Sequence, residues 1–514
     1  MNGAHSVVQT LVDSGVEVCF ANPGTSEMHF VAALDEVSGM RGVLGLFEGV
    51  VTGMADGYGR MAGKPAATLL HLGPGLANGL ANLHNAGRAG TPVVNIVGDH
   101  ATYHLQYDAP LTADIVGIAR PVSGWVHTTT SALTAAADTA RAVQAAMAVP
   151  RQVATLILPA DAAWSPAERP APPLPFATAS AVTDAAVGTV AAALRNGRRT
   201  ALLLGGGALT EPALAAAGRV AAATGARLLC DTFTPRLARG AGRVPVERIP
   251  YFAEQIVQTL ADVEQLVLVN AKPPVAFFAY PGKPSWGLPD GAEIMVLAQA
   301  FEDGAAALDA LVAVVGASSS APVVADLAVD ADTSGRFDQF GIGRIVAAHL
   351  PEGAIVSDEA ATSSIGSQLA LVTAAPHDVL SLMGGSIGQG LPVATGAAVA
   401  CPDRKVVCLH GDGGAMYTLQ SLWTQARERL DVTTVIFANR SYAILNIELQ
   451  RVGVAESGPT AAAMFDLSDP ALDWVQLANG MGVEAVRVGS LAEFDAAFSS
   501  AMAQRGPRLI EVLL

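Results

Sequence analysis

The chain has 514 residues, of which 51% are hydrophobic and 15% charged, and its formal net charge is -16. This length and apolar content predict about three domains with buried cores. The acidic balance argues against nucleic acid or an anionic membrane as partner, because both require a basic face. The four cysteines are scattered, no apolar run is long enough to span a membrane, and the first residues show neither the basic nor the apolar region of a secretion leader, so secretion is not expected. We therefore expect a cytoplasmic protein with reduced thiols and no membrane partner.

Short apolar runs, Gly/Pro turns and Ala-rich stretches alternate through the first part of the chain. Strands are expected at residues 16–20, 67–70 and 93–97, each followed by a turn. The order strand, turn, helix, strand is typical of a parallel α/β sheet. A proline-rich stretch at residues 165–175 has no period and predicts a linker.

The rest of the chain repeats this pattern twice. Strands are expected in a middle segment at residues 201–204, 266–270 and 293–297, and in a third segment at residues 354–357, 406–409, 434–437 and 509–513. A second linker, rich in Ser, Ala and Asp, lies near residues 317–335. The predicted fold class is α/β, with three domains over residues 1–164, 176–320 and 336–514. Each is expected to have a central parallel sheet flanked by helices.

The turn Gly411-Asp412-Gly413-Gly414 lies between an expected strand and a helical stretch expected at residues 417–429. Asn439 follows 27 residues later, just after the next expected strand. This places Asp412 and Asn439 at the C-terminal ends of two strands, where open α/β sheets bind ligands. Glycines and a helix N-terminus suit phosphates, and carboxylate and amide oxygens suit Mg²⁺. A Gly-Asp-Gly turn alone is usually ordinary, so Asn439 is what indicates a metal and diphosphate site.

Glu48 lies in the otherwise uncharged run 44–51 and directly precedes a helix of small residues expected at 52–60. A single glutamate at a helix start is usually only a partner of the helix dipole. A third motif, Gly-Gly-Ser-Ile-Gly-Gln-Gly-Leu-Pro at residues 384–392, predicts a tight turn before another helix.

The segment of Glu48 with Ala-Asp-Gly-Tyr-Gly-Arg at residues 55–60, the 384–392 turn, and the Gly-Asp-Gly turn with Asn439 occur in this order. Together they resemble the thiamine-diphosphate enzymes that include acetohydroxyacid synthase, pyruvate decarboxylase and benzoylformate decarboxylase. The resemblance spans the whole chain and is greatest to acetohydroxyacid-synthase-like large subunits. It implies a pyrimidine-binding, a central and a diphosphate-binding domain, with thiamine diphosphate and Mg²⁺ as cofactors. It also implies a homodimer or homotetramer with active sites between subunits.

The resemblance also implies residue roles. Mg²⁺ would be held by Asp412, the Asn439 side chain and the Ser441 main-chain carbonyl. The Glu48 carboxyl, with its pKa raised by an apolar pocket, would bind the pyrimidine ring nitrogen and activate the cofactor. Ile387 would hold the two rings of the cofactor in a V shape. The expected cofactor contacts are Glu48, Pro23, Gly24, Thr25, Gly385, Ser386, Ile387, Gly411, Gly413, Gly414, Ala415, Tyr442, Ala443 and Ile444.

The implied reaction is non-oxidative decarboxylation of a 2-oxo acid, carboligation, or both, through an enamine or acyl-anion intermediate. His71 aligns with a catalytic histidine of benzoylformate decarboxylase and Thr25 with its serine, whereas its second histidine falls at about Ala279. The synthase glutamine, lysine and tryptophan match Leu111, Gly124 and about Glu448. The expected lining is Leu111, Phe277, Phe278, Leu445 and Tyr442. It indicates an apolar 2-oxo acid, although a structural role for these residues is equally open.

Two other functions compete with this interpretation. The lost synthase residues suggest a catalytically silent acetohydroxyacid synthase paralogue that acts as a binding or regulatory partner, but the retained Glu48 argues against it. A nicotinamide dehydrogenase needs a GxGxxG turn after its first strand, which Gly205-Gly206-Gly207-Ala208 does not supply. FAD in the central domain is less expected, and no motif decides it.

Overall fold

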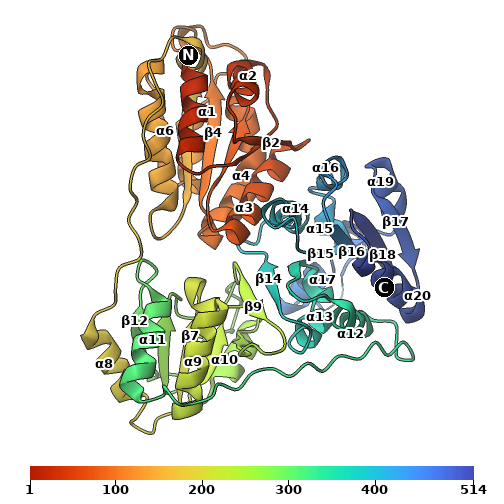
Figure 1. Cartoon of the computed structure of the whole chain (residues 1–514). Coiled ribbons are helices and arrows are strands. Elements are labelled where there is room, and N and C mark those ends of the chain that lie inside the picture. The colour runs from red at the N-terminus through yellow and green to blue at the C-terminus, as the bar shows by residue number, and fades with distance from the viewer. Residues whose placement is uncertain (456) are drawn as a thin grey trace.

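The structure, a computed structural model, describes residues 1–455 and 457–514. It contains three sheets with helices on their faces (Figure 1), which confirms the predicted α/β class. The first sheet has six parallel strands in the order β2-β1-β3-β4-β6-β5. They are β1 (Val18–Ala21), β2 (Arg41–Leu44), β3 (Ala66–Leu70), β4 (Val93–Asp99), β5 (Trp125–Thr128) and β6 (Val153–Pro159).

Helices cover both faces of the first sheet, so its central strands are mostly apolar. The buried polar residues Thr68, Asn95 and Thr155 of these strands are hydrogen-bonded to one another. One face packs on α1 (Gly3–Asp13), α2 (Met28–Glu36), α6 (Ala132–Met147) and α7 (Ala160–Trp164). The other packs on α3 (Glu48–Ala62), α4 (Leu72–Ala89) and α5 (Ile115–Ala119). Among the described residues, no helix has the length and hydrophobicity that a membrane crossing requires.

The second sheet is built from the middle segment and has five parallel strands in the order β10-β8-β7-β11-β12. They are β7 (Thr200–Leu204), β8 (Arg227–Cys230), β10 (Glu247–Arg248), β11 (Gln265–Val269) and β12 (Glu293–Ala298). Its helices are α8 (Asp184–Ala193), α9 (Glu211–Thr224), α10 (Ala253–Leu260) and α11 (Gly304–Val315).

The third sheet has the strand order β17-β18-β16-β15-β13-β14-β9. Its strands are β13 (Ile355–Glu359), β14 (His377–Ser381), β15 (Val406–Gly411), β16 (Val432–Ala438), β17 (Glu484–Val488) and β18 (Arg508–Leu513). Its helices are α12 (Gln339–His349), α13 (Ile365–Ala370), α14 (Gly390–Ala400), α15 (Asp412–Ala415), α16 (Ser421–Glu428), α17 (Ala443–Arg451), α18 (Pro459–Phe465), α19 (Trp474–Gly480) and α20 (Leu491–Ala503).

One edge strand of the third sheet comes from the middle segment, which the sequence does not predict. Strand β9 (Leu237–Arg239) pairs antiparallel with β14. Beside it, Arg236 Nη2 lies 3.1 Å from Asp378 Oδ2 of β14. The third sheet is therefore parallel except at this edge, and the middle segment is joined to it by main-chain hydrogen bonds.

The helix expected at residues 417–429 is present but begins later, at Ser421, because residues 416–420 form a turn. The chain forms the short helix α15, a turn, and then α16. The turn carries Thr418, whose hydroxyl donates to the Gly388 carbonyl at 2.8 Å. This tertiary contact favours the turn over a continuous helix. The helix expected at residues 52–60 also begins earlier, because Glu48 is the first residue of α3.

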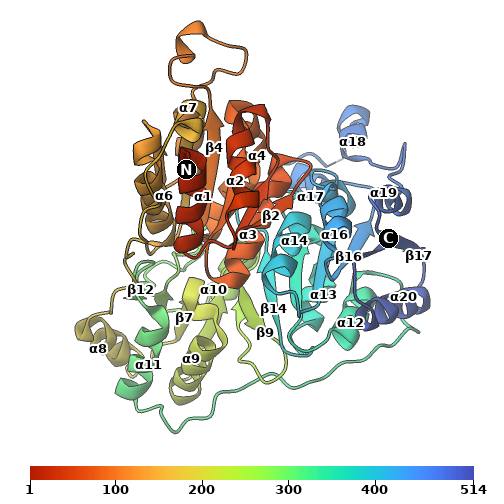
Figure 2. The same ribbon diagram turned by 45° about the horizontal axis from the view of Figure 1, so that its top comes forward.

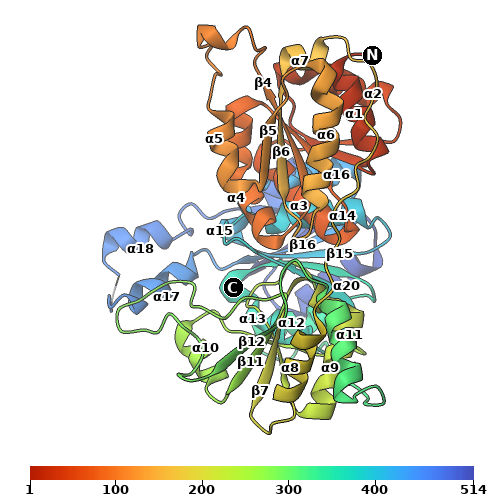
Figure 3. The same cartoon turned by 90° about the vertical axis from the view of Figure 1, so that its left-hand side faces the viewer.

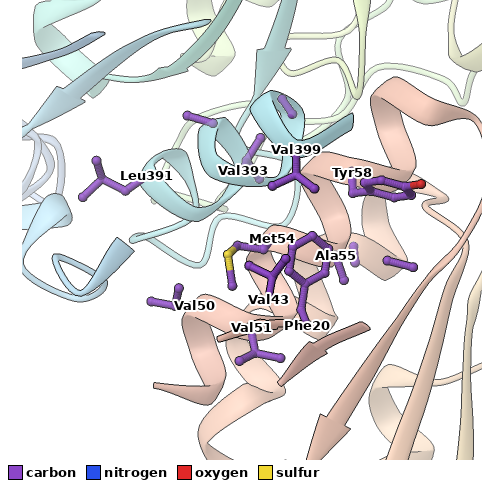
Figure 4. Packing of buried hydrophobic residues seen from close by; sticks show 14 of the residues in the cluster. Phe20, Val43, Val50, Val51, Met54, Ala55, Tyr58, Leu391, Val393 and Val399 are labelled. Carbon is purple, nitrogen blue, oxygen red and sulfur yellow. The ribbon is translucent and has the colours of Figure 1, made fainter. Parts of the chain in front are cut away.

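The first and third sheets share one hydrophobic core, in which α3 crosses α14 at very close range (Figure 4). A Cβ added at Gly396 would lie 1.9 Å from the Met54 carbonyl oxygen, and one added at Gly57 would lie 2.1 Å from that of Val393. Gly57 of α3 and Gly396 of α14 are therefore required by this crossing. In Figure 2 the middle segment (yellow to green) lies below the first part of the chain and beside the third, and in Figure 3 it lies at the bottom of the molecule.

His377 provides a pH test of the third sheet. It begins β14, is fully buried, and its Nδ1 lies 2.7 Å from the Ala375 carbonyl oxygen. Burial lowers the pKa of His377 to about 4, and the nearby charges of Arg239 and Arg243 add to this effect. Because the folded pKa lies below the unfolded value, stability that is present above about pH 6.5 is lost as the pH falls toward 4.

The free energy of unfolding should fall between pH 7 and pH 4.5 in both proteins. We expect the fall to be smaller in His377→Gln than in the wild type, by about 2 kcal/mol. Urea unfolding at the two pH values measures the difference. The exposed His29, replaced by Gln in the same way, is the control and should behave like the wild type. Identical acid sensitivity of His377→Gln and wild type would contradict the prediction.

Candidate active site

Two polar side chains meet where β15 and β16 end. These neighbouring parallel strands pair in a register that sets Gly411 opposite Phe437. Asp412 follows directly after β15, and Asn439 directly after β16. The Arg440 N–H donates to Asp412 Oδ2 at 2.8 Å, so the two strand ends are also hydrogen-bonded to each other. We call these residues, with Ser441, the metal edge.

Asp412 is a buried carboxylate without a positive partner among its hydrogen-bond donors. Within the described part of the chain, its side chain accepts only from main-chain N–H groups, those of Gly413 at 2.9 Å and of Arg440. Burial raises the pKa of Asp412 above its usual value, although these hydrogen bonds lower it in part. A divalent cation would stabilise the charged form. The Asn439 Oδ1 accepts from the Ser441 N–H at 3.1 Å and points to the same turn.

The donor set of the metal edge fits Mg²⁺. It consists of one carboxylate, one amide oxygen and one main-chain carbonyl, which leaves positions for phosphate oxygens and water. Among the residues that the structure describes, no group of three or more His, Cys, Asp or Glu side chains forms an alternative metal site.

The glycine turn beside the metal edge gives close backbone access. A Cβ at Gly413 would lie 2.5 Å from the ring of Tyr442, and one at Gly414 would lie 3.1 Å from the ring of His410. Tyr442 precedes α17, which begins with Ala443 and Ile444. Gly411 ends β15, and Ala415 ends α15. The expected diphosphate contacts of the third segment are therefore all close to one edge.

Residues 384–390, here called the pyrimidine loop, lead into α14. Gly385 and Gly388 have φ values of +76° and +89°, which favour glycine. Asn85 of α4 binds the loop at both main-chain polar groups of Ser386, donating to its carbonyl at 2.8 Å and accepting from its N–H at 3.2 Å. Ile387 is 38% exposed, so its side chain is free to contact a ligand.

Glu48 and His71 lie on either side of the first turn of α4. The Glu48 carboxylate is half-buried, and Asn78 Nδ2 donates to its Oε2 at 3.1 Å. A Cβ at Gly75 would lie 3.3 Å from both Glu48 Oε1 and His71 Cβ. The structure therefore brings together the two residues expected to be catalytic, at the C-terminal edge of the first sheet.

His71 is paired with a residue that the sequence interpretation missed. Its Nδ1 lies 2.9 Å from Oε2 of the buried Glu27, which also accepts from the Gly24 N–H at 2.8 Å. Burial raises the pKa of Glu27, and the contact with His71 reduces that rise. Gly24 lies so close to the His71 ring that a Cβ would be 2.1 Å from Nδ1. Thr25 begins the short 3-10 turn that carries Glu27, directly after Pro23 and Gly24.

A charged cluster lies at the far end of α17. The Tyr280 hydroxyl donates to Glu448 Oε2, and the Arg451 guanidinium lies between the rings of Tyr280 and Phe252, at 4.7 and 4.6 Å. Glu254 binds Arg451 at 2.9 Å. Glu448 lies at about the position that matches the substrate-selecting tryptophan of synthases. It is thus hydrogen-bonded to Tyr280, the residue after Ala279.

The apolar residues expected to line the substrate site are more exposed than the charged cluster around Arg451. Phe277, Phe278, Leu445 and Leu111 all rank among the exposed large side chains, and Phe277 stacks on Tyr251 with ring centroids 4.8 Å apart. Whether these residues contact a substrate stays a prediction.

Glycine turns and polar side chains at the ends of parallel strands are typical of α/β proteins that bind a ligand at that edge. The family models "Thiamine pyrophosphate enzyme, N-terminal TPP binding domain" and "Thiamine pyrophosphate enzyme, C-terminal TPP binding domain" match residues 1–118 and 361–512. A Mycobacterium tuberculosis protein with the provisional name acetolactate synthase large subunit IlvX is 54% identical, over 100% of this chain and 99% of its own. The chain belongs to the thiamine pyrophosphate enzyme family, which confirms the resemblance.

Other relatives include decarboxylases. The benzoylformate decarboxylase of Pseudomonas aeruginosa is 29% identical, over 100% of this chain and 99% of its own. Among solved structures, the benzoylformate decarboxylase of Polynucleobacter necessarius has a TM-score of 0.86 at 20% identity, covering 100% of this chain and 99% of that one. A 4-hydroxybenzoylformate decarboxylase of Rhodococcus jostii has a TM-score of 0.84 at 23% identity, covering 99% and 98%. These structures share the fold of the whole chain.

Proposed function

We propose that this chain catalyses non-oxidative decarboxylation of a 2-oxo acid, carboligation of its acyl group to a second carbonyl, or both, with thiamine diphosphate and Mg²⁺. The observation that carries the proposal is the buried Asp412 beside Asn439 at two adjacent strand ends. When bound, thiamine diphosphate accepts the electron pair that the departing carboxylate leaves on carbon.

The metal edge would hold Mg²⁺ through Asp412, the Asn439 side chain and the Ser441 carbonyl. The main chain of the glycine turn would bind the diphosphate. The pyrimidine loop would bind the aminopyrimidine through its main chain, and Ile387 would support the bent shape of the cofactor. Each of these groups lies at an edge or in a loop that its neighbours hold in place.

Glu48 would hold a proton at the pyrimidine ring nitrogen and so activate the cofactor. We propose that it acts on the metal edge of a neighbouring subunit, so that the working unit is a homodimer or homotetramer. The exposed Ile387 and the half-buried Glu48 support this arrangement, since both are open to a partner. All four cysteines are free thiols, which suits the reducing cytoplasm that we propose as the compartment.

His71 would move a proton to or from the substrate. Glu27 holds Nδ1 of the ring, which leaves Nε2 for the substrate and fixes the orientation of the imidazole. Thr25, on the same turn as Glu27, would add a hydroxyl to this site. An apolar 2-oxo acid is the proposed substrate, with Leu111, Phe277, Phe278 and Leu445 as its lining.

A catalytically silent paralogue that binds a true synthase subunit is the second candidate. The observation in its favour is Glu448, which is bound to Tyr280 at the position expected to select a synthase substrate. Adding the purified chain to a synthase subunit separates the two: changed assembly or rate supports the silent role, and no change removes it.

The main experiment is a titration of the full-length protein with thiamine diphosphate, with and without Mg²⁺, followed by CO₂ release from a panel of apolar 2-oxo acids. We expect cofactor binding that depends on Mg²⁺ and CO₂ release that depends on both. Mg²⁺-dependent binding without turnover on any 2-oxo acid would favour the silent paralogue. Absence of cofactor binding would contradict the enzymatic proposal and would leave the partner role to the assembly experiment.

Glu27→Gln tests the pair of Glu27 and His71, because we expect it to raise the free energy of unfolding and to lower kcat. Because burial raises the pKa of Glu27, its charged form destabilises the fold, and this cost grows as the pH rises through the folded pKa. We expect Glu27→Gln to have a higher unfolding free energy than wild type at pH 8, with the difference shrinking toward pH 4. We expect kcat to fall at least about tenfold, because His71 loses its fixed orientation.

The exposed pair His5–Glu36 offers a matched control, with Nδ1 3.0 Å from Oε2. Glu36→Gln should change neither quantity, because an exposed pair contributes little. A Glu27→Gln variant that keeps full activity would remove the proposed role of the pair.

A further inference from the structure

Glu359 is a buried carboxylate that the proposed mechanism leaves without a role. It is the last residue of β13, its side chain is 4% exposed, and it pairs in register with His410 of β15. Both of its oxygens accept from the pyrimidine loop. The Gly388 N–H donates to Oε1 at 2.6 Å, and the Gly390 N–H donates to Oε2 at 2.5 Å.

Packing around Glu359 is as close as its hydrogen bonding. The His410 ring is fully buried, and its Nε2 lies 3.4 Å from Glu359 Oε2. A Cβ at Gly390 would lie 2.7 Å from His410 Cδ2 and 3.0 Å from Glu359 Cβ, and a Cβ at Gly414 would lie 3.3 Å from Glu359 Oε1. Glu359 therefore lies between the pyrimidine loop and the glycine turn of the metal edge, and touches both.

The pyrimidine loop depends on these contacts because its glycines allow many backbone conformations. Gly385 and Gly388 both have positive φ, and neither carries a side chain that could restrict the backbone. The residue Gly388 is held at both of its polar groups, since its carbonyl accepts from Thr418 while its N–H donates to Glu359. Hydrogen bonds to an ionised acceptor are stronger than neutral ones, and losing the acceptor would leave two buried donors without a partner.

We propose that Glu359 is a positioning residue of the cofactor site, which holds the pyrimidine loop in the conformation that presents Gly385 and Ile387 to the aminopyrimidine end of thiamine diphosphate. Glu359 acts through the loop and does not itself touch the cofactor. The consequence for cofactor binding rests on the proposed function, whereas the holding of the loop does not.

Two variants and one control test this. Glu359→Ala removes both acceptors, and Glu359→Gln keeps the shape of the side chain but offers one neutral acceptor. The control Asp358→Asn changes the preceding, half-buried carboxylate, which binds Ala360 and Gln368 instead of the loop. Amide hydrogen exchange of a peptide that covers residues 384–390 is measured in the cofactor-free, full-length proteins. Binding of thiamine diphosphate with Mg²⁺ is then titrated, and the KM values for cofactor and 2-oxo acid are compared.

We expect exchange in residues 384–390 to be at least about tenfold faster in Glu359→Ala, intermediate in Glu359→Gln and unchanged in Asp358→Asn. We expect the Kd and KM for thiamine diphosphate to rise at least about tenfold, with the KM for the 2-oxo acid unchanged. Unchanged exchange in Glu359→Ala, or faster exchange without weaker cofactor binding, would overturn the proposal. If the wild type binds no thiamine diphosphate, the proposed function fails, and faster exchange in the variants still supports the holding of the loop.

Discussion

Glu48→Gln is expected to lower kcat by about 10²–10⁴-fold while leaving cofactor affinity nearly unchanged. Glutamine keeps the size of the side chain and its contact with Asn78, but it cannot hold a proton at the pyrimidine ring nitrogen. Exchange of the cofactor C2 proton, followed by NMR, measures the activation directly. It should fall at least about tenfold in the variant.

A matched control comes from another helix. Glu211 is the first residue of α9, as Glu48 is of α3, and Glu211→Gln should leave kcat and C2 exchange unchanged. Equal exchange in wild type and Glu48→Gln would refute the activating role, whatever the effect on kcat.

Asp412→Asn is expected to change cofactor binding and stability in opposite directions. Loss of the charged ligand should weaken Mg²⁺-dependent binding of thiamine diphosphate by about 100-fold or more. Without metal, the variant should melt at a higher temperature than wild type at pH 8. The reason is that burial raises the pKa of Asp412, so its charged form destabilises the metal-free fold above that pKa. Calorimetric titration and thermal melts measure the two effects.

Asp378 is the control, because it is a buried carboxylate of the same sheet with the opposite electrostatics. Burial raises its pKa, but the hydrogen bonds and charges of Arg404 and Arg236 lower the pKa below its usual value overall. Asp378→Asn should therefore lower the melting temperature at pH 8 and leave the metal affinity unchanged. A higher melting temperature for Asp378→Asn, or a lower one for Asp412→Asn, would contradict this electrostatic account.

The strands of the three sheets can be predicted from the sequence because buried parallel strands are short apolar runs bounded by turn residues. The run expected at residues 406–409 lies inside β15, and that at 434–437 lies inside β16. The placement of Asp412 and Asn439 then follows from topology, since parallel strands end at the same edge. The family resemblance, which rests on three short motifs, is confirmed as well.

Features that depend on tertiary contacts cannot be predicted from apolar runs and turn residues. No proline or glycine marks the interruption at residues 416–420, where the Thr418 contact with the pyrimidine loop decides the backbone. Strand β9 has only three residues, and its partner lies in another segment of the chain.

Two acidic residues of the candidate site show the same limit. Glu27 meets His71 across 44 residues, and Glu359 meets Gly388 across 29, so no local spacing relates them. The only signal for Glu359 is an acid just past the strand expected at residues 354–357, at an edge where ligands are expected. That signal is weak, because acids at strand ends are common on protein surfaces.

Strand β9 also decides how this protein can be divided into fragments. A C-terminal fragment that begins after the middle segment would lack β9 and would expose the main-chain donors and acceptors of β14 to solvent. An open strand edge of this kind recruits other chains, so such a fragment would be prone to self-association. Expression of a separate C-terminal unit would therefore need residues 237–239 grafted back. An internal deletion of the middle segment would remove β9 and so damage the third sheet, although most of the middle segment does not belong to that sheet.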